Sequence, residues 1–184
     1  MILYHISENP NIQRFNPRPI LNQNCEIVGN AVWAIDEDHL ANYLLPRDCP
    51  RLVFFKNNNS TKADIEKFSG NSSADRIIAV ESFWGSQIFE QNLFQYEFDD
   101  SQFSCIDESA GYFISRDTVN PIKATCISNG LLRILSTNTE FRIMPSLWKL
   151  REDVINSSLG YSIIRMRNAQ LPPEGIDRFH PLPQ

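Results

Sequence analysis

Side chains that can act as acids, bases or metal ligands are scattered along this chain of 184 residues. The three histidines stand far apart, at His5, His39 and His180, and a Cys–His catalytic pair would depend entirely on the fold. No two cysteines have the two-residue spacing typical of zinc knuckles or thioredoxin-like motifs. We therefore expect no metal cofactor, and we expect free thiols at all four cysteines, Cys25, Cys49, Cys105 and Cys126.

Common nucleotide-binding and hydrolase motifs are missing from the sequence. It has no P-loop, no GxGxxG, no HExxH and no Gly-x-Ser-x-Gly elbow. Four arginines in the last third could hold a pyrophosphate or a nucleic-acid phosphate through paired hydrogen bonds. The alternative is that they are solvated or salt-bridged surface residues. These arginines are Arg142, Arg151, Arg165 and Arg167.

The composition predicts a soluble globular protein, with 42% hydrophobic residues and a net charge of −5. That charge disfavours broad binding to nucleic acid or to a membrane surface. The amino terminus lacks a basic region followed by a long apolar run, so we expect a cytoplasmic protein. We predict one domain over residues 1–170 and a Pro-rich C-terminal tail over residues 171–184.

The positions of His5 and of Asp36 depend on the first predicted elements. Residues 2–6 form a short apolar strand that contains His5, and a lone histidine in a strand is commonly a packed, hydrogen-bonded residue. Residues 31–35 form a second strand. Asp36 then fits the N-cap of a helix that presents Leu40, Tyr43 and Leu44 on one face and that ends at Pro46.

The remaining pattern predicts an α+β fold with a mainly antiparallel sheet. Alternation of apolar and polar residues over 93–98 indicates a half-buried strand. Residues 160–168 fit either a strand or a helix. Further strands are expected at 51–55, 76–81, 103–106, 112–115, 122–127 and 141–144. Helices are expected between Thr61 and Gly70, around residues 83–89, and after Ser146.

Three segments resemble the ADP-ribosyltransferase superfamily, in particular its poly-ADP-ribose polymerase-like branch. Leu3-Tyr-His-Ile-Ser7 is similar to the motif of the first strand. Gly29, Val32-Trp33, Asp36 and Ala41-Asn-Tyr43 are similar to the following strand and helix. Gly111–Ile122 is similar, more weakly, to the strand after the catalytic glutamate, with its downstream Val and Pro. The chain as a whole also resembles a bacterial family of uncharacterised function.

The resemblance implies an ADP-ribosyltransferase-like split sheet, in which the strands bearing His5 and Trp33 are neighbours, and a pocket for NAD. It implies that His5 bonds the adenine-side ribose and that the backbone at Ile6 holds the nicotinamide amide. Trp33 would stack on the nicotinamide ring. The expected catalytic residues are His5, Trp33 and Glu108, and the expected NAD-binding residues are His5, Ile6, Ser7, Trp33, Tyr43 and Arg151.

The chain departs from this superfamily at the catalytic glutamate, which aligns with Gly111. Glu108, three residues earlier, is the substitute that we expect, although an odd displacement along a strand reverses the face of the side chain. The predicted function is binding of NAD, with transfer of ADP-ribose to an unknown acceptor left open. The alternatives are a non-catalytic module that binds a nucleotide, a modified protein or a nucleic-acid end, and an interaction protein with a filled pocket.

Overall fold

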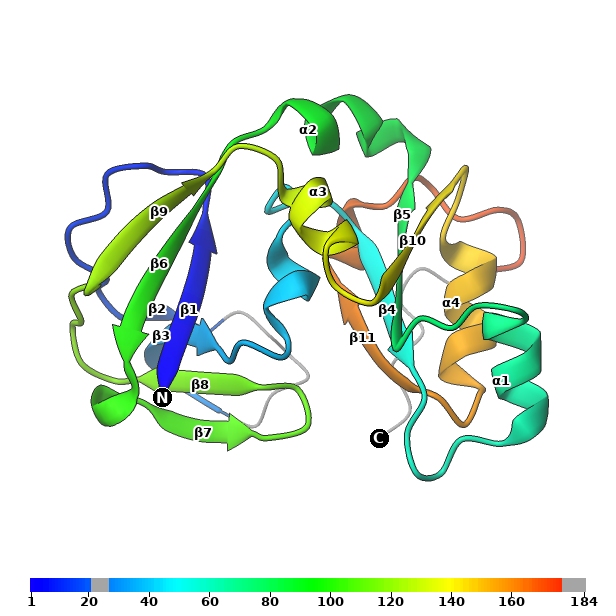
Figure 1. The fold of residues 1–184 in the computed structure, drawn as a ribbon, viewed down its shortest axis with the longest axis horizontal. Helices are drawn as coiled ribbons and strands as arrows, with labels where there is room; N and C mark the ends of the chain where they lie inside the picture. The colour runs from blue at the N-terminus through cyan, green and yellow to red at the C-terminus, as the bar shows by residue number, and fades with distance from the viewer. Residues whose placement is uncertain (21–26, 177–184) are drawn as a thin grey trace. The chain divides into compact units, whose positions relative to one another are not determined.

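The computed structural model describes residues 1–20 and 27–176, which form two compact units (Figure 1). The first unit consists of Met1–Leu44 and Gln91–Gly130, and the second unit consists of Leu45–Glu90 and the chain from Leu131 onwards. The predicted α+β class with mainly antiparallel sheets is confirmed. The prediction that residues 1–170 are one domain stays a prediction. Cys25, His180 and the end of the predicted tail lie outside the described residues.

The first unit is built on one antiparallel sheet with the order β7-β8-β3-β1-β6-β9. Strand β2 pairs with Asn30 and Ala31, the first two residues of β3, which β8 does not reach. Strand β1 pairs with β6 along its whole length. The strands are β1 (Ile2–Ser7), β2 (Arg18–Pro19), β3 (Asn30–Ile35), β6 (Leu93–Asp99), β7 (Ser104–Asp107), β8 (Tyr112–Ser115) and β9 (Lys123–Ile127). Two 3-10 turns, η1 (Leu40–Tyr43) and η3 (Asp100–Gln102), follow β3 and β6.

One face of this sheet forms the hydrophobic core of the first unit. Side chains alternate between the two faces along a strand, so every second residue of β1, β3 and β6 enters this core. The core residues come from these three strands and from the segments around Phe15 and Val119, which pair through a short bridge. They are Leu3, Phe15, Val32, Ala34, Tyr96, Phe98 and Val119.

The second unit contains a four-stranded sheet with the order β10-β5-β4-β11, in which β10 and β5 are parallel and the other pairs are antiparallel. Its strands are β4 (Arg51–Phe55), β5 (Arg76–Glu81), β10 (Thr139–Met144) and β11 (Gly160–Ile164). Its helices and turns are α1 (Lys62–Ser69), η2 (Ser82–Trp84), α2 (Gly85–Glu90), α3 (Gly130–Leu135), α4 (Trp148–Ile155) and η4 (Met166–Asn168).

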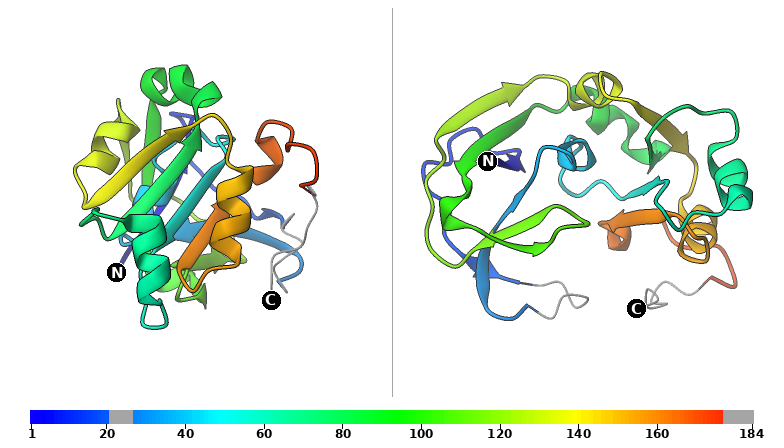
Figure 2. Two further views of the ribbon diagram at one scale, coloured as in Figure 1. Left: turned by 90° about the vertical axis from the view of Figure 1, so that its right-hand side faces the viewer. Right: turned by 60° about the horizontal axis from the view of Figure 1, so that its bottom comes forward.

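Helices α1 and α4 lie side by side on one face of the second sheet (Figure 2). Phe68 of α1 and Val154 of α4 are buried in one cluster with residues of β4 and β5. The predicted signals at the ends of α1 are confirmed, because the Thr61 side chain accepts the N–H of Asp64 and Gly70 ends the helix with a positive φ of 52°.

The structure corrects one local prediction, decides one that was left open and adds one helix. The helix expected after Asp36 is only the 3-10 turn η1, because the chain first makes a turn over residues 37–39. Residues 160–168, left open between strand and helix, form β11 and then η4, separated by Arg165 in the left-handed region. Helix α3 was not predicted; it has six residues, too few for a helical period to be recognised.

Asp64 links α1 to the segment before β11, and this link gives a test of the second unit. Its Oδ2 accepts hydrogen bonds from the backbone N–H and the hydroxyl of Ser158, at 2.9 and 2.6 Å. These bonds, with that from Thr61, lower the pKa of Asp64 from its usual value. Because the folded pKa lies below the unfolded pKa, the carboxylate stabilises the fold above the unfolded pKa. This stabilisation is lost as the pH falls through the folded pKa.

We expect Asp64→Asn to lower the free energy of unfolding at pH 7, with the difference from the wild type shrinking in acid. Urea unfolding of both proteins at pH 7 and near pH 2.5 measures this difference. An equal difference at both pH values would show that the charge of Asp64 contributes nothing.

Candidate functional site

Three aromatic residues form a cluster in the first unit, here called the Trp33 cluster: Trp33 of β3, Tyr112 of β8 and Tyr43 of η1. The rings of Trp33 and Tyr112 are nearly perpendicular, at 89°, with their centroids 5.7 Å apart. The Tyr43 hydroxyl donates to the Tyr112 hydroxyl at 3.0 Å. All three side chains are half-buried. The edge-to-face contact fixes the plane of an indole that is still partly exposed.

Strand β3 is joined to β1 by a side chain as well as by the sheet. Within the described residues, the paired positions of these two strands are Tyr4 and Ile35 alone. Beyond that pair, Nδ1 of His5 donates to the carbonyl oxygen of Trp33 at 2.8 Å. The imidazole therefore binds a carbonyl group that a longer ladder would have paired with backbone. The expectation that the strands bearing His5 and Trp33 are neighbours is confirmed.

The rings of His5 and Trp33 project from opposite faces of the sheet. His5 pairs with Tyr96 across β1 and β6, and its ring meets Phe15 edge-on at 5.0 Å, on the core face. Trp33 lies between Val32 and Ala34, which point into that same core, so Trp33 points the other way. His5 thus contacts the Trp33 backbone and not its ring. The role of His5 as a ribose ligand stays a prediction.

Two polar side chains of β6 share the face of Trp33. Tyr4 pairs with Ile35 on one side and with Glu97 on the other, which puts Glu97 and Gln95 on the Trp33 face. Glu97 accepts hydrogen bonds from Nε2 of Gln95 at 3.3 Å and from Nζ of Lys123 at 3.1 Å. Gln95 is only 5% exposed, and in the described part of the chain no donor reaches its Oε1. A buried acceptor without a donor is costly.

A histidine–carboxylate pair lies where β3 leads into η1. Oδ1 of Asp36 accepts the backbone N–H of His39 at 2.9 Å and its ring Nδ1 at 2.7 Å. The predicted capping role of Asp36 is present in the first of these bonds. Gly111 packs against this pair with a φ of +67°, and a Cβ built there would collide with His39 and lie 2.6 Å from both Asp36 oxygens. The backbone N–H of Asp36 also donates to the carbonyl of Gly111, at 3.2 Å.

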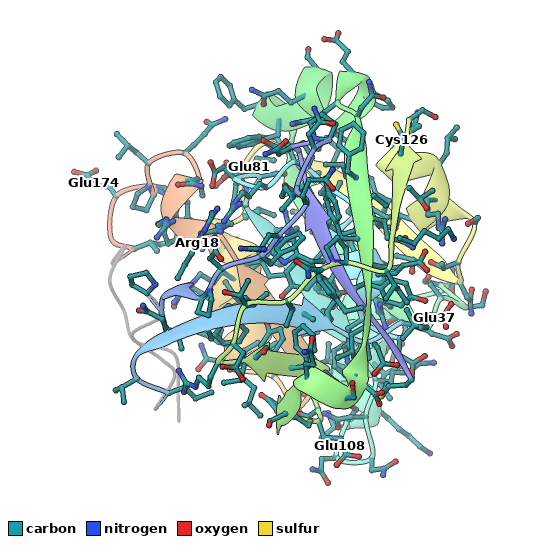
Figure 3. All side chains as sticks on the ribbon, turned by 90° about the vertical axis from the view of Figure 1, so that its left-hand side faces the viewer. Arg18, Glu37, Glu81, Glu108, Cys126 and Glu174 are labelled. Carbon is teal, nitrogen blue, oxygen red and sulfur yellow. The ribbon has the colours of Figure 1, made fainter. Side chains whose placement is uncertain are left out.

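The other predicted site residues have different surroundings. Glu108 is exposed on the turn that joins β7 to β8, at the end of this hairpin (Figure 3). Ile6 is half-buried and pairs with Gln95, so it lies on the Trp33 face. Ser7 is 6% exposed, and its hydroxyl accepts the N–H of Asn9. Arg151 belongs to α4 of the second unit, where it is buried, pairs with Glu152 and lies over the Trp148 ring.

The structure therefore brings Trp33, Tyr43 and Ile6 to one region of the first unit and leaves the ring of His5 on the other face. Sequence reasoning missed Tyr112, Gln95 and the pairing of His39 with Asp36. The alternation over residues 93–98 did contain a signal, because it set Gln95 and Glu97 on the face opposite the core.

A comparison with protein-family models gives one match, described as a family of unknown function (DUF6886), over residues 4–169. The chain belongs to the DUF6886 family. Searches of curated proteins and of solved structures gave no match. The family match spans most of the residues of both units, so the site described above lies within the part that defines the family.

Two general properties of the described residues bear on partners. None of their helices is both long and apolar enough to cross a membrane. They also contain no group of three or more His, Cys, Asp or Glu residues arranged to hold a metal ion.

The Cys49 thiol is buried, which raises its pKa to about 12, whereas Cys105 and Cys126 are exposed.

The contact of Gly111 with Asp36 and His39 predicts that adding a side chain at this position destabilises the fold strongly. We expect Gly111→Ala to lower the free energy of unfolding by more than the roughly 1–2 kcal/mol that a left-handed residue costs by strain alone. Gly29→Ala is the control, because Gly29 belongs to the same unit and also has a positive φ, of 94°, but its built Cβ meets only the end of the Arg116 side chain, at 3.4 Å. Urea unfolding of the two variants compares them, and equal losses would contradict the packing at Gly111.

Proposed function

We propose that this protein binds NAD or a related nucleotide on the Trp33 face of the first unit's sheet, with a planar ring of the ligand stacked on Trp33. The observation that carries the proposal is the Trp33 cluster. Tyr112 fixes the indole plane, and Tyr43 in turn fixes Tyr112. An aromatic side chain held in place before binding loses little rotamer freedom when a flat ring stacks on it.

Polar groups on the same face support a ligand that carries both a flat ring and hydrogen-bonding groups. The side chains of Gln95 and Glu97 offer an amide and a carboxylate beside Ile6, the residue whose backbone the resemblance assigns to the nicotinamide amide. Aromatic walls with a few fixed polar groups are typical of small-molecule sites. The proposal uses residues of the first unit alone and does not involve Arg151.

The same geometry favours binding over transfer assisted by a glutamate at position 111. A side chain at Gly111 would collide with Asp36 and His39, so a carboxylate cannot extend from that position without moving the pair. Glu108 is exposed on the hairpin turn, in a solvated environment in which a carboxylate stabilises charge weakly. His5 in this proposal is a positioning residue that holds the Trp33 backbone.

Thermal unfolding with and without NAD tests the proposal. At a ligand concentration about one hundred times Kd, binding to the native state adds about 2.7 kcal/mol of stability. We expect NAD to raise the Tm of the wild type, Trp33→Phe to keep most of this shift because it keeps an aromatic face, and Trp33→Leu to abolish it.

The control for this experiment is Trp84→Leu, which removes a tryptophan of the second unit and leaves Trp33 in place. Its NAD-dependent shift should equal that of the wild type. A wild-type protein whose Tm does not respond to NAD, or a Trp33→Leu variant that responds fully, would rule the proposal out.

A further inference from the structure

Strand β10 forms one outer edge of the second unit's sheet. It pairs with β5 along all six of its residues, in an unbroken parallel register. In the part of the chain that the structure describes, no strand pairs with its other side. An outer strand presents a row of backbone N–H and C=O groups to which another strand can bind. None of the six side chains is buried, and Ile143 is 48% exposed.

This edge lacks the features that commonly block pairing with another strand. Bulges, lysines and prolines all disfavour contact between sheet edges. The two outer strands of the first unit's sheet have such features, because the register of β7 shifts after Cys105 and β9 begins with the exposed Lys123. Strand β10 contains no proline, no lysine and no break in register. Its outer edge is therefore open to a further strand.

The two charged residues of β10 have opposite signs and are two positions apart. Glu140 and Arg142 lie on the same face of the strand, and Nε of Arg142 donates to Oε1 of Glu140 at 2.6 Å. Nη2 of Arg142 donates to the carbonyl oxygen of Phe68 at 2.7 Å, which ties the guanidinium to the end of α1. The side chains of Arg142 and Glu140 are 29% and 32% exposed, so a charge on a neighbouring strand can reach them.

A second copy of the same strand matches this charge pattern when it runs antiparallel about Phe141. A two-fold axis perpendicular to the sheet keeps every side chain on its own face, and Glu140 of each copy then lies opposite Arg142 of the other. Opposite charges at such positions stabilise a sheet, and like charges destabilise it. Moving the register by two residues in either direction sets Glu140 against Glu140 or Arg142 against Arg142. The charges therefore favour one register.

Exposed apolar side chains lie near both ends of β10. In the same register, Ile143 of one copy lies opposite Thr139 of the other. Helix α3 ends at Leu135, shortly before Thr139 in the chain. Leu132 and Leu135, one turn apart on that helix, are 64% and 51% exposed. The pairing brings the exposed Ile143 of one copy to the segment that follows these leucines in the other, which adds apolar contact to the backbone ladder.

We propose that two copies of this protein pair through β10, antiparallel and centred on Phe141, so that their four-stranded sheets continue into one another. Two Glu140–Arg142 pairs form between the copies, and the half-buried Phe141 side chains face each other at the two-fold axis. Strand β11, the other outer strand of this sheet, contains no charged residue, so no charge selects a register there. The proposal uses the second unit alone and is independent of nucleotide binding at Trp33.

Charge reversal tests this pairing on the full chain, with the molar mass in solution measured by light scattering at several concentrations. The wild type should have the mass of two chains. Glu140→Arg and Arg142→Glu each set like charges opposite one another in both pairs, so each should raise the Kd of the dimer about tenfold or more. An equimolar mixture of the two variants opposes positive and negative charges again and should form a heterodimer.

The double variant Glu140→Arg/Arg142→Glu keeps an ion pair within the strand, so it keeps the proposal testable if a single reversal does not fold. It should dimerise as the wild type does. It should not exchange subunits with the wild type, because the mixed contact opposes like charges. Glu37→Arg, the control, makes the same change of charge at an exposed residue of the first unit and should leave the mass and the Kd unchanged.

Three results would overturn the proposal. The first is a wild-type protein that is monomeric at every concentration tested. The second is a dimer whose Kd neither reversal changes. The third is a double variant that exchanges freely with the wild type, because the charges of β10 would then not lie between the copies.

Discussion

A single side-chain hydrogen bond, from His5 to the carbonyl oxygen of Trp33, holds β1 to β3 where their backbone pairing ends. Without it, the Trp33 carbonyl would lie between two strands with no ladder to satisfy it, and an unpaired carbonyl there is unfavourable. The bond fixes the backbone from which the indole projects. The core on one face of the sheet, packed around Phe15, is thereby connected to the aromatic cluster on the other face.

Gly111 imposes the second constraint, through the side chain that it lacks. Its positive φ and its contact with Asp36 and His39 allow the β7–β8 hairpin to approach the end of β3 closely. That approach places Tyr112 against Trp33. A larger residue would separate the hairpin from the pair, so the aromatic cluster and the histidine–carboxylate pair depend on the same glycine.

The sequence predicted what depends on local pattern. Apolar runs and alternation located most strands, and turn residues located the ends of α1. It also predicted that His5 and Trp33 lie on neighbouring strands. It did not predict that their rings leave opposite faces, because that depends on the register between β1, β3 and β6. The bond from the His39 ring to Asp36 depends on the turn geometry over residues 37–39, and the burial of Gln95 depends on tertiary packing. Neither leaves a periodic signal in the sequence.

The central claim, that a nucleotide ring stacks on Trp33, is tested most directly by the indole N–H signals of the three tryptophans in a ¹H–¹⁵N NMR spectrum. Trp148 is an internal reference, since its indole N–H is held by the carbonyl of Gln170 at 2.7 Å in the second unit. Titration with NAD should shift the Trp33 signal in a saturable way and leave those of Trp84 and Trp148 unchanged. An unchanged Trp33 signal at saturating NAD, or equal shifts of all three signals, would contradict the account.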